Sequence, residues 1–349
     1  MFQHKCSLLT SLVAAGLALV SGIIAQAQTS YSFRDLGTLG GTSSSATGVN
    51  NAGQVVGAST LANGASHGFY WSAGTGMVDI PTFGGTGGGA KGLNNVGDVV
   101  GHATNAAGVW HAFLWNSSTH ALTDLNSLLS ATDASNWVLT YAWKVNNNRQ
   151  VIGQGIKGGA TYYNAYVLDL NTGTLTDMGV FGPHGINNLL APQVVGDNSG
   201  VSYLYSNGST VSLASLASAK DTNNMGAIVG YLPNAHAAYR SPAGVITDLG
   251  EWGGAAGLAS ANSINNASTP MVVGDSNYYQ KGSVLTHRAF RWIVGNGAMQ
   301  DLNSLTSNLG RKMILFGANC VSDTGYIACQ QDPAGYSTGN THAFLLTPQ

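Results

Sequence analysis

Residues 48–57 read GVNNAGQVVG, and residues 92–101 read GLNNVGDVVG. The same pattern returns from Val145 to Gly153 and, in more divergent form, at 185–196, 223–230 and 264–274. A seventh copy spans Val321 to Cys329. Self-similarity at a nearly fixed period is the signature of a repeat architecture, so this motif decides the fold class.

Two further marks accompany the motif. The first is a step of the Asp-Leu type after a β-rich run, with its aspartates at Asp35, Asp79, Asp124, Asp177, Asp248 and Asp301 and a degenerate copy at 211–213. The second is a run like His-Ala-Phe-Leu-Trp, with its histidines at His67, His111, His287 and His342 and divergent copies at 164–168, 203–205 and 236–239. Each mark therefore also occurs seven times.

The period of the repeat is about 45 residues, measured between Gly57 and its last equivalent, Cys329. Each period contains four short β-rich runs. Asn and Gly tolerate the positive φ of hairpin turns, so Asn-Asn-x-Gly is predicted to join the first two strands of each period. Four short strands per period predict an all-β fold, a seven-bladed β-propeller. A sustained helical period is missing from the sequence, which argues against a helical solenoid.

The two ends of the repeat array are incomplete. The array begins with an isolated fourth-type strand at 31–36 and ends with an isolated third-type strand at 342–346. Pairing these strands completes the last blade and leaves no missing strand in the ring. We therefore expect residues 28–349 to form one propeller domain closed by its N- and C-terminal strands. The two longest connectors, 126–136 and 303–312, both follow an Asp-Leu-Asn step and are expected on the same face.

Composition and the first residues predict an exported protein. The chain has 349 residues, of which 8% are charged, with a formal net charge of −2. This charge gives no electrostatic reason to expect nucleic acid or an anionic membrane as partner. Lys5, an apolar run at 8–24 and Ala-Gln-Ala at 25–27 form a secretory signal peptide pattern, so residues 1–27 are predicted to be removed. A transmembrane anchor is the alternative, disfavoured because the run is short and contains Ser and Thr. The mature chain is expected to be secreted, periplasmic or at the cell surface, with no transmembrane segment.

The repeat resembles that of the HAF-repeat family of bacterial extracellular proteins. The shared patterns are DLGTLGG at 35–41, VNNAGQVVG at 49–57 and HAFLW at 111–115, and the similarity spans residues 31–348. The family name describes a repeat and not an activity. The resemblance implies export and a repetitive β architecture, and it brings no catalytic residues to transfer.

The repeated aspartates and histidines are predicted to be structural. A catalytic group is needed once, whereas a residue present in every repeat is most simply one that builds the repeat. We expect the aspartates to accept hydrogen bonds from turn N–H groups and the histidines to satisfy a neighbouring polar group. The chain has a single glutamate, Glu251, and no spacing singles out the carboxylate pair of a glycosidase. Neither a Cys/His cluster nor an Asp-rich calcium loop occurs, so no metal or other cofactor is predicted.

These features predict a non-catalytic binding or surface-interaction module whose unknown ligand is a glycan or a protein. The binding candidates are aromatic residues outside the His-Ala-Phe-Leu-Trp run, because such rings stack on sugars or anchor a partner: Trp110, Trp137, Trp252, Tyr278 and Tyr279. Packing between blades is the alternative for these rings, and the aromatic residues of the His-Ala-Phe-Leu-Trp run itself are expected to form core between blades. The competing function is an extracellular polysaccharide-active enzyme, a hydrolase or lyase. Carboxylates gathered at the channel mouth would favour the enzyme, and a ring of repeated backbone and asparagine would favour the binding module.

Two cysteines fall in one copy of the motif. Aligning Gly325 with Gly53 puts Cys320 on Gly48 and Cys329 on Gly57. If these positions face one another across the hairpin, their Cα atoms lie about 4.5–5.5 Å apart, within reach of a disulfide. We therefore expect a structural Cys320–Cys329 bridge in an oxidising environment, with buried free thiols as the alternative.

Overall fold

The structure, a computed structural model, describes residues 30–252, 257–280, 284–307, 309, 313–332 and 341–349. Their regular structure is β-strand apart from three short helical segments: η1 (Leu125–Leu128), α1 (Ala131–Ala134) and α2 (Leu302–Leu305). No helix in this part of the chain is long and apolar enough to cross a membrane. The predicted signal peptide, residues 1–27, lies outside the described residues.

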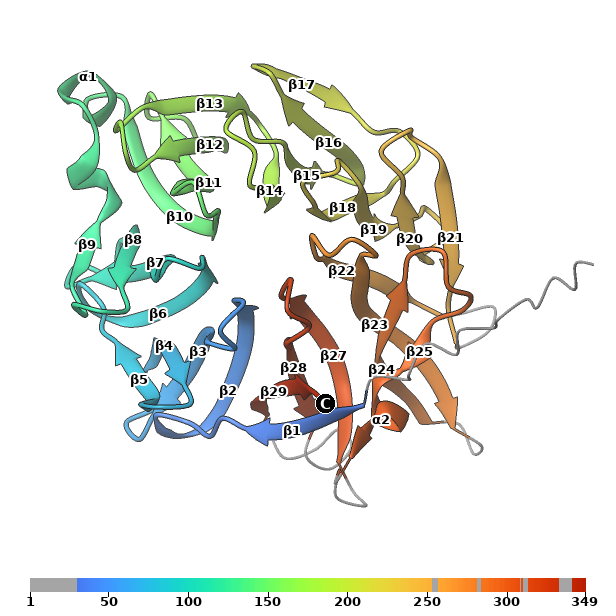
Figure 1. Ribbon diagram of the computed structural model, residues 1–349. Helices are drawn as coiled ribbons and strands as arrows, with labels where there is room; N and C mark the ends of the chain where they lie inside the picture. The colour runs from blue at the N-terminus through green and yellow to red at the C-terminus, as the bar shows by residue number, and fades with distance from the viewer. Residues whose placement is uncertain (1–29, 253–256, 281–283, 308, 310–312, 333–340) are drawn as a thin grey trace, which may run out of the picture.

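The strands pair in chain order into antiparallel sheets that stand around a common axis (Figure 1). The first sheets along the chain comprise β2 (Gly40–Val49), β3 (Val55–Leu61), β4 (Ser66–Ser72) and β5 (Gly76–Ile80); β6 (Gly84–Leu93), β7 (Asp98–Asn105), β8 (Trp110–Asn116) and β9 (Leu122–Asp124); then β10 (Trp137–Val145), β11 (Gln150–Lys157), β12 (Tyr163–Asp169) and β13 (Leu175–Gly179). A parallel bridge between Ser66 and Gly87 links the first two of these sheets.

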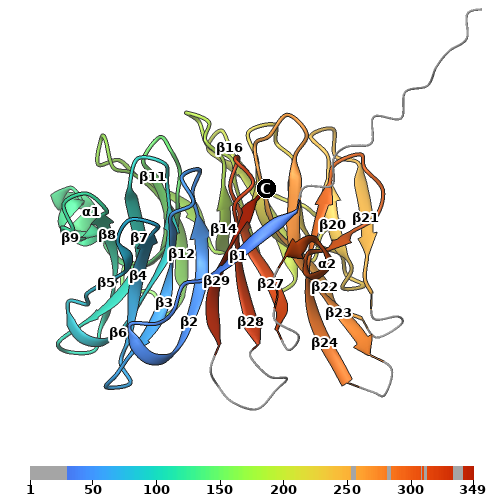
Figure 2. The same cartoon turned by 60° about the horizontal axis from the view of Figure 1, so that its bottom comes forward.

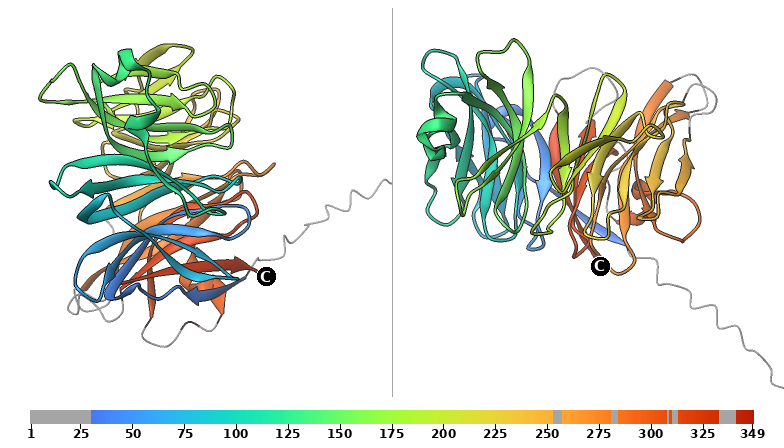
Figure 3. Two further views of the ribbon diagram at one scale, coloured as in Figure 1. Left: turned by 90° about the vertical axis from the view of Figure 1, so that its left-hand side faces the viewer. Right: turned by 90° about the horizontal axis from the view of Figure 1, so that it is seen from above.

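The later sheets repeat the arrangement. They comprise β14 (Gly182–Ile186), β15 (Val194–Asn198), β16 (Val201–Ser206) and β17 (Ser209–Ser212); β18 (Ser218–Thr222), β19 (Ile228–Tyr231), β20 (Ala237–Arg240) and β21 (Ile246–Gly250); β22 (Ala259–Ile264), β23 (Met271–Gln280), β24 (Val284–Ile293) and β25 (Gln300–Asp301); and finally β27 (Ile314–Val321), β28 (Ile327–Asp332) and β29 (His342–Pro348). The first strand of every sheet lies nearest the axis, and the sheets stand side by side around a short, wide ring (Figure 3). We call β2, β6, β10, β14, β18, β22 and β27 the inner strands.

The N-terminal strand β1 (Tyr31–Asp35) lies in the sheet of the C-terminal strands. It pairs antiparallel with β29, with Tyr31 opposite Pro348 and Asp35 opposite Phe344. On its other side it meets the short strand β26 (Thr306–Ser307) in parallel. Figure 2 shows β1 beside β29. The two ends of the chain therefore share one sheet.

The core is built between neighbouring sheets, from the apolar positions of the repeat. The aromatic rings of the third strands are almost completely buried: Phe69, Phe113, Tyr166, Phe290 and Phe344. The closing glycine of the motif makes room for them. A Cβ added to Gly57 would collide with the Ser45 carbonyl oxygen and lie 2.7 Å from the Phe69 ring. The glycine at the end of the motif thus leaves the space into which the predicted core aromatic of the third strand packs.

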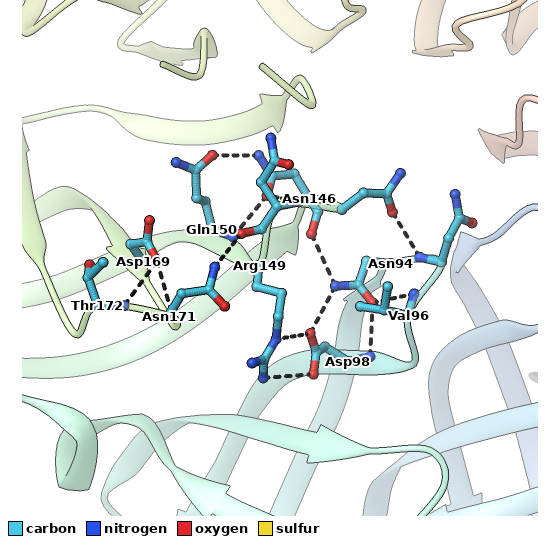
Figure 4. Close-up of polar contacts among 12 residues, drawn as sticks. Asn94, Val96, Asp98, Asn146, Arg149, Gln150, Asp169, Asn171 and Thr172 are labelled. Carbon is cyan, nitrogen blue, oxygen red and sulfur yellow. Dashed lines mark hydrogen bonds and ion pairs between the residues drawn. The ribbon is translucent and has the colours of Figure 1, made fainter. Parts of the chain in front are cut away.

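The Asn-Asn-x-Gly turns have the predicted positive φ, at Gly53, Gly97, Gly226 and Gly325 and, without glycine, at Arg149. The first asparagine of each turn does more than shape it. Asn94 Oδ1 accepts from Val96 N (3.1 Å) and Asp98 N (2.9 Å), while its Nδ2 donates to the Asn146 carbonyl oxygen of the next sheet (3.1 Å; Figure 4). The amides that donate to the next turn in this way are Asn50, Asn94, Asn146, Asn187, Asn223 and Asn265, the last to Ser322. We call this set, with Ser322, the inner amide ring.

The second residue of each turn forms an outer amide ring. Asn51 N donates to Asn95 Oδ1 (3.0 Å), and each following turn repeats this bond. The ring runs through Asn51, Asn95, Asn147, Asn188, Asn224, Asn266 and Asp323. Asp323 N donates back to Asn51 Oδ1 (2.9 Å), so these seven hydrogen bonds between described residues return to their start. The motif therefore joins neighbouring sheets as well as neighbouring strands.

The repeated aspartates and histidines lie at the outer strands and pair with one another. His111 Nδ1 lies 2.6 Å from Asp124 Oδ2, and Asp124 Oδ1 accepts from Asn126 N. The same pairing joins His67 to Asp79, His236 to Asp248 and His342 to Asp35. Asp177 bonds Asn164 and Lys157 instead, Asp301 bonds Arg288, and His287 faces Asp275 at 3.5 Å. The carboxylates thus bond turn N–H groups and side chains of their own sheet, and a structural role for these residues stays a prediction.

The two longest connectors are attached in the same way. Asn126 in η1 bonds both the N–H and the carbonyl of Leu139, and Asn303 in α2 bonds both groups of Leu315. Leu139 and Leu315 lie near the start of an inner strand, whereas the amide rings follow the ends of these strands. Both connectors therefore emerge on one face, as expected, and this face is the one opposite the amide rings. Residues 310–312 of the second connector lie outside the described residues.

The expected Cys320–Cys329 disulfide was wrong, because the structure has both residues as free cysteines. A bulge between Ala318 and Cys320 shifts the register, so Cys329 lies opposite Ala318 and Cys320 opposite Ala328. The alignment itself was sound, but the same shift places Gly48 opposite Val56 rather than Gly57. A shift of one residue turns a side chain to the other face of the sheet. Cys329 is accordingly buried in the core of the last sheet, and Cys320 packs against a different core cluster.

Candidate functional site

Every inner strand carries a β-bulge at the same place in the repeat. In β6 the register passes from Ala90–Gly101 to Gly92–Val100, so Lys91 has no partner on β7. The residues skipped in this way are Thr47, Lys91, Trp143, His184, Lys220, Asn262 and Asn319, which we call the bulge residues. A bulge bends its strand and re-aims the unpaired side chain, and bulges are common beside functional sites.

The bulge residues surround a cavity on the axis of the ring. This central cavity has a volume of about 350 Å³, and its lining includes six of them: Lys91, Trp143, His184, Lys220, Asn262 and Asn319. Lys144 and Gln154 complete most of the wall. Among the described residues that line it there are three lysines and neither Asp nor Glu. The cavity is therefore an electropositive chamber in a protein with few charges.

Lys91 is the least neutralised of these lysines. Its Nζ lies 5.5 Å from the centroid of the Trp143 ring, a cation–π contact. Within the described residues no carboxylate lies within the 4 Å of an ion pair, and burial lowers the Lys91 pKa. Trp143 is itself held in place, since its indole N–H donates to Gln154 Oε1 (3.3 Å). An incoming anion would relieve the cost of burying this ammonium group.

Lys220 and His184 share one carboxylate behind the cavity wall. Lys220 Nζ lies 3.7 Å from Asp197 Oδ2 and 3.4 Å from His184 Nδ1. Burial, followed by the charge of Lys220, lowers the His184 pKa to about 4, although Asp197 acts in the opposite direction. His184 is therefore neutral near pH 7, and Asp197 offsets only one lysine.

A second, smaller cavity of about 130 Å³ lies under the amide rings and shares Lys144 with the central cavity. Its polar lining comes from asparagines of the two amide rings, from Thr222, Ser322 and Asp323, and from the residues that directly follow the bulges: Lys144, Asp221, Ser263 and Cys320. The equivalent positions in three other sheets are glycines. A Cβ at Gly185 would lie 2.6 Å from Asp221 Cα, and one at Gly92 would lie 2.9 Å from Lys144 Cα. The glycines thus give Asp221 and Lys144 the space they occupy.

Hydrogen bonds hold Asp221 in place in the wall of this smaller cavity. Ser263 Oγ donates to Asp221 Oδ2 (2.8 Å) and lies 3.9 Å from Cys320 Sγ. Burial raises the Asp221 pKa against the opposing effect of Lys144 and the hydrogen bond from Ser263. Burial alone would lower the Lys144 pKa, but Cys320 and Asp221 outweigh it and the net direction is upward. Lys144 and Asp221 thus shift one another's pKa, and the walls of the smaller cavity hold two carboxylates, those of Asp221 and Asp323.

An aromatic cluster extends from Trp143 away from the central cavity, between the sheets of β8 and β10. Tyr141 stacks on Trp143 with ring centroids 5.4 Å apart. His102 meets both Tyr141 and Trp110 edge-on at 5.0 Å, and Tyr163 contacts Tyr141 at 5.7 Å. Trp110 and Tyr141 are half-buried, and Tyr163 is 38% exposed. The Nδ1 atom of His102 is buried without a hydrogen-bond partner among the described atoms.

The predicted binding aromatics do not come together at one site. Trp110 belongs to the cluster around Tyr141. Trp137 is buried at 6% exposure against Tyr166, so its expected binding role is not supported and the packing alternative applies. Trp252 packs on a core cluster and meets Phe290 edge-on. Tyr278 and Tyr279 belong to β23, but their side chains lie outside the described residues.

Sequence reasoning did not identify the bulge residues. The usable signal is a break in the repeat: the third position before the first Asn of the motif is occupied by Thr, Lys, Trp, His, Lys, Asn and Asn. The surrounding motif is conserved between repeats, so this variable position is not needed to build them. Among the described residues, no group of three His, Cys, Asp or Glu side chains is placed to hold a metal ion.

Comparison with solved structures shows a β-propeller fold. The chain is similar to the β-propeller domain of the Trilobed protease from Pyrococcus furiosus (8% identity, 88% of this chain and 94% of that one, TM-score 0.53). It is also similar to an oligogalacturonate lyase from Vibrio parahaemolyticus (10%, 91% and 97%, TM-score 0.52). The third similar structure is an acylaminoacyl peptidase from Pyrococcus horikoshii (9%, 90% and 52%, TM-score 0.54), of which the chain spans about half the length.

These similarities show the fold alone, because an identity near 10% does not indicate a shared activity. The similar structures include peptidases and a lyase. No family model matches the chain. No curated protein matches it either.

Proposed function

We propose that this protein is an exported, non-catalytic binding module that holds a small anionic group in its central cavity. One observation carries the proposal: the described residues that line the central cavity include three lysines and no carboxylate, and two of these lysines stand on bulges that re-aim their side chains. Anions are drawn to such a site because a low-dielectric wall strengthens each charge–charge contact.

The scaffold behind this proposal is a single seven-bladed propeller, residues 28–349, closed by β1 and β29. The strand pairing of β1 and the outer amide ring support it. Export, removal of residues 1–27 and membership of the HAF-repeat family belong to the same proposal and rest on the sequence patterns. The amide rings at the channel mouth support the binding module, whereas the two carboxylates that line the smaller cavity, Asp221 and Asp323, are the feature that would favour an enzyme.

A second candidate is an extracellular polysaccharide-active enzyme. The observation that favours it is the group formed by Lys144, Asp221, Ser263 and Cys320, where a carboxylate, a hydroxyl and a thiol meet beside an amine. Asp221→Asn separates the two candidates. It should abolish the turnover of an enzyme, whereas a binding module should keep its ligand affinity.

The binding proposal is tested with small anions and lysine variants. Binding of citrate and of inorganic phosphate to the purified chain is measured by isothermal titration calorimetry. Lys91→Met and Lys220→Met should each weaken citrate binding about tenfold or more, and added salt should weaken it further. Lys157→Met is the matched control, because Lys157 also lies over a tryptophan, Trp137 at 5.7 Å, but on the outside of its sheet beside Asp177. Unchanged citrate binding in both cavity variants would overturn the proposal.

A further inference from the structure

The aromatic cluster is a local departure from the repeat. Tyr141 stands five residues before the first Asn of its motif. The equivalent positions in the other repeats are all small: Ser45, Gly89, Gly182, Ser218, Ser260 and Gly317. A side chain as large as Tyr at one position of seven does not serve the construction of the fold. It marks the interface between the sheets of β8 and β10 as specialised.

Neighbouring residues enlarge this surface. Trp110 and Tyr163 both stand directly before the His-Ala-Phe-Leu-Trp run, where other repeats have residues such as Ser66 and Thr341. They flank Tyr141 from two adjacent sheets, with Trp110 at 6.3 Å and Tyr163 at 5.7 Å between ring centroids. The result is a row of partly exposed rings, from Trp110 through Tyr141 to Trp143, which we call the aromatic row.

The aromatic row ends in the electropositive chamber. Trp143 stacks on Tyr141 and also lines the central cavity, where Lys91 lies over its ring. The buried, unpartnered Nδ1 of His102 lies beneath the row, between Trp110 and Tyr141. Burial and the nearby Lys91 lower the His102 pKa to about 4, so this imidazole is neutral near pH 7.

The chemistry of the cavity wall selects the occupant. Apart from Trp143, Gly182 and Pro183, its described lining is amine, imidazole or amide, including Gln154, Asn262 and Asn319. These amides donate and accept hydrogen bonds, as hydroxyl-rich ligands require, and the carbon surface between the polar groups offers apolar contact to a sugar ring. Aromatic faces offer the flat apolar contact on which a sugar ring packs.

We propose that the ligand is an acidic oligosaccharide whose rings pack along the aromatic row and whose carboxylate is held by Lys91 in the central cavity. The inference rests on the proposed function, and it adds the class of ligand and the direction from which it enters. The row supplies apolar contact to successive sugar rings, and the lysine distinguishes an acidic chain from a neutral one.

The test compares three probes by isothermal titration calorimetry on the purified chain: galacturonate, a tetramer of galacturonate, and the same tetramer with its carboxylates methyl-esterified. The tetramer should bind at least tenfold more tightly than the monomer and than the esterified tetramer. Trp110→Ala and Tyr163→Ala should each weaken tetramer binding about threefold to tenfold and leave monomer binding unchanged, because they remove ring contacts alone. Tyr162→Ala is the matched control, since Tyr162 is exposed and adjacent but has no ring contact in the cluster.

The outcomes separate this inference from the proposed function. If the tetramer binds no more tightly than the monomer, while Lys91→Met still abolishes monomer and citrate binding, the anion site stands and the oligosaccharide is overturned. If esterification leaves tetramer affinity unchanged, the role of Lys91 is wrong. If an acidic peptide such as tetraglutamate binds as tightly, with the same loss in Trp110→Ala, the ligand is a peptide and the proposal fails. Thermal melts of Trp110→Ala and Tyr163→Ala confirm that both variants are folded.

Discussion

Replacing Asn94 by Asp tests whether the inner amide ring holds neighbouring sheets together. Asp shapes a turn as well as Asn does, because both side chains accept hydrogen bonds from the backbone two residues on. If Asn94 only shaped its turn, Asn94→Asp would be close to neutral. The structure predicts otherwise, since Asn94 is 3% exposed and its Nδ2 donates two hydrogen bonds that a carboxylate cannot make.

The cost follows from these two bonds. The first reaches the Asn146 carbonyl oxygen at 3.1 Å, and losing it costs about 1 kcal/mol. The second reaches Asp98 Oδ2 at 3.0 Å, and a bond to a charged group is worth roughly 1.5–3 kcal/mol. The new carboxylate would also repel Asp98, whose side chain is 3% exposed. We expect Asn94→Asp to lower the free energy of unfolding by at least about 3 kcal/mol at pH 7.

The assay is urea denaturation followed by tryptophan fluorescence, with Asn95→Asp as the control. Asn95 belongs to the same turn and is exposed, and its Oδ1 only accepts from Asn51 N (3.0 Å), which Asp also does. This control should lie within about 0.5 kcal/mol of the parent protein. Coincident denaturation midpoints for Asn94→Asp and Asn95→Asp would refute the reasoning and reduce the motif to a hairpin turn.

Three further results are expected. Thiol titration without reductant should find both Cys320 and Cys329 free after unfolding, and Cys329 unreactive in the native state because burial raises the pKa of its thiol; recovery of a disulfide-linked peptide by mass spectrometry would contradict this. Asp177→Asn should lower the free energy of unfolding at pH 7. Burial raises the Asp177 pKa, but Lys157, the Gly179 N–H and Asn164 outweigh burial, so the pKa is lowered on folding. The difference in unfolding free energy between variant and parent should therefore shrink as the pH falls below about 4, measured by denaturation at a series of pH values. Deleting residues 28–37 removes β1 with the fully buried Tyr31 and should lower the melting temperature of the whole domain by more than about 5 °C; a melt like that of the intact chain would show that β1 adds nothing.

Much of the architecture was accessible from the sequence. The repeated motif predicted four short strands per period, hairpin turns with positive φ and buried third-strand aromatics, and the structure shows each of these at residues such as Gly53 and Phe69. These features are local or follow from the two-residue period of a strand, so they can be recognised without knowing which strands meet. Asp–His pairs such as His111 with Asp124 lie within one repeat, but His342 and Asp35 come from opposite ends of the chain and meet only in the folded structure.

The site was decided by tertiary structure. The sequence marks the position of Lys91 and Trp143 as variable between repeats, but it does not show that their partner strands skip this position, because a bulge depends on how two strands twist and pair. The same unseen bulge at Asn319 defeated the disulfide prediction, since one extra residue turns Cys320 and Cys329 to different neighbours. The amide rings were missed because their donors and acceptors lie in neighbouring sheets, about one repeat apart in the chain. Only the arrangement of the sheets around a common axis brings lysines from different repeats to one cavity, which is why the sequence determined the fold class and the tertiary structure determined the candidate site.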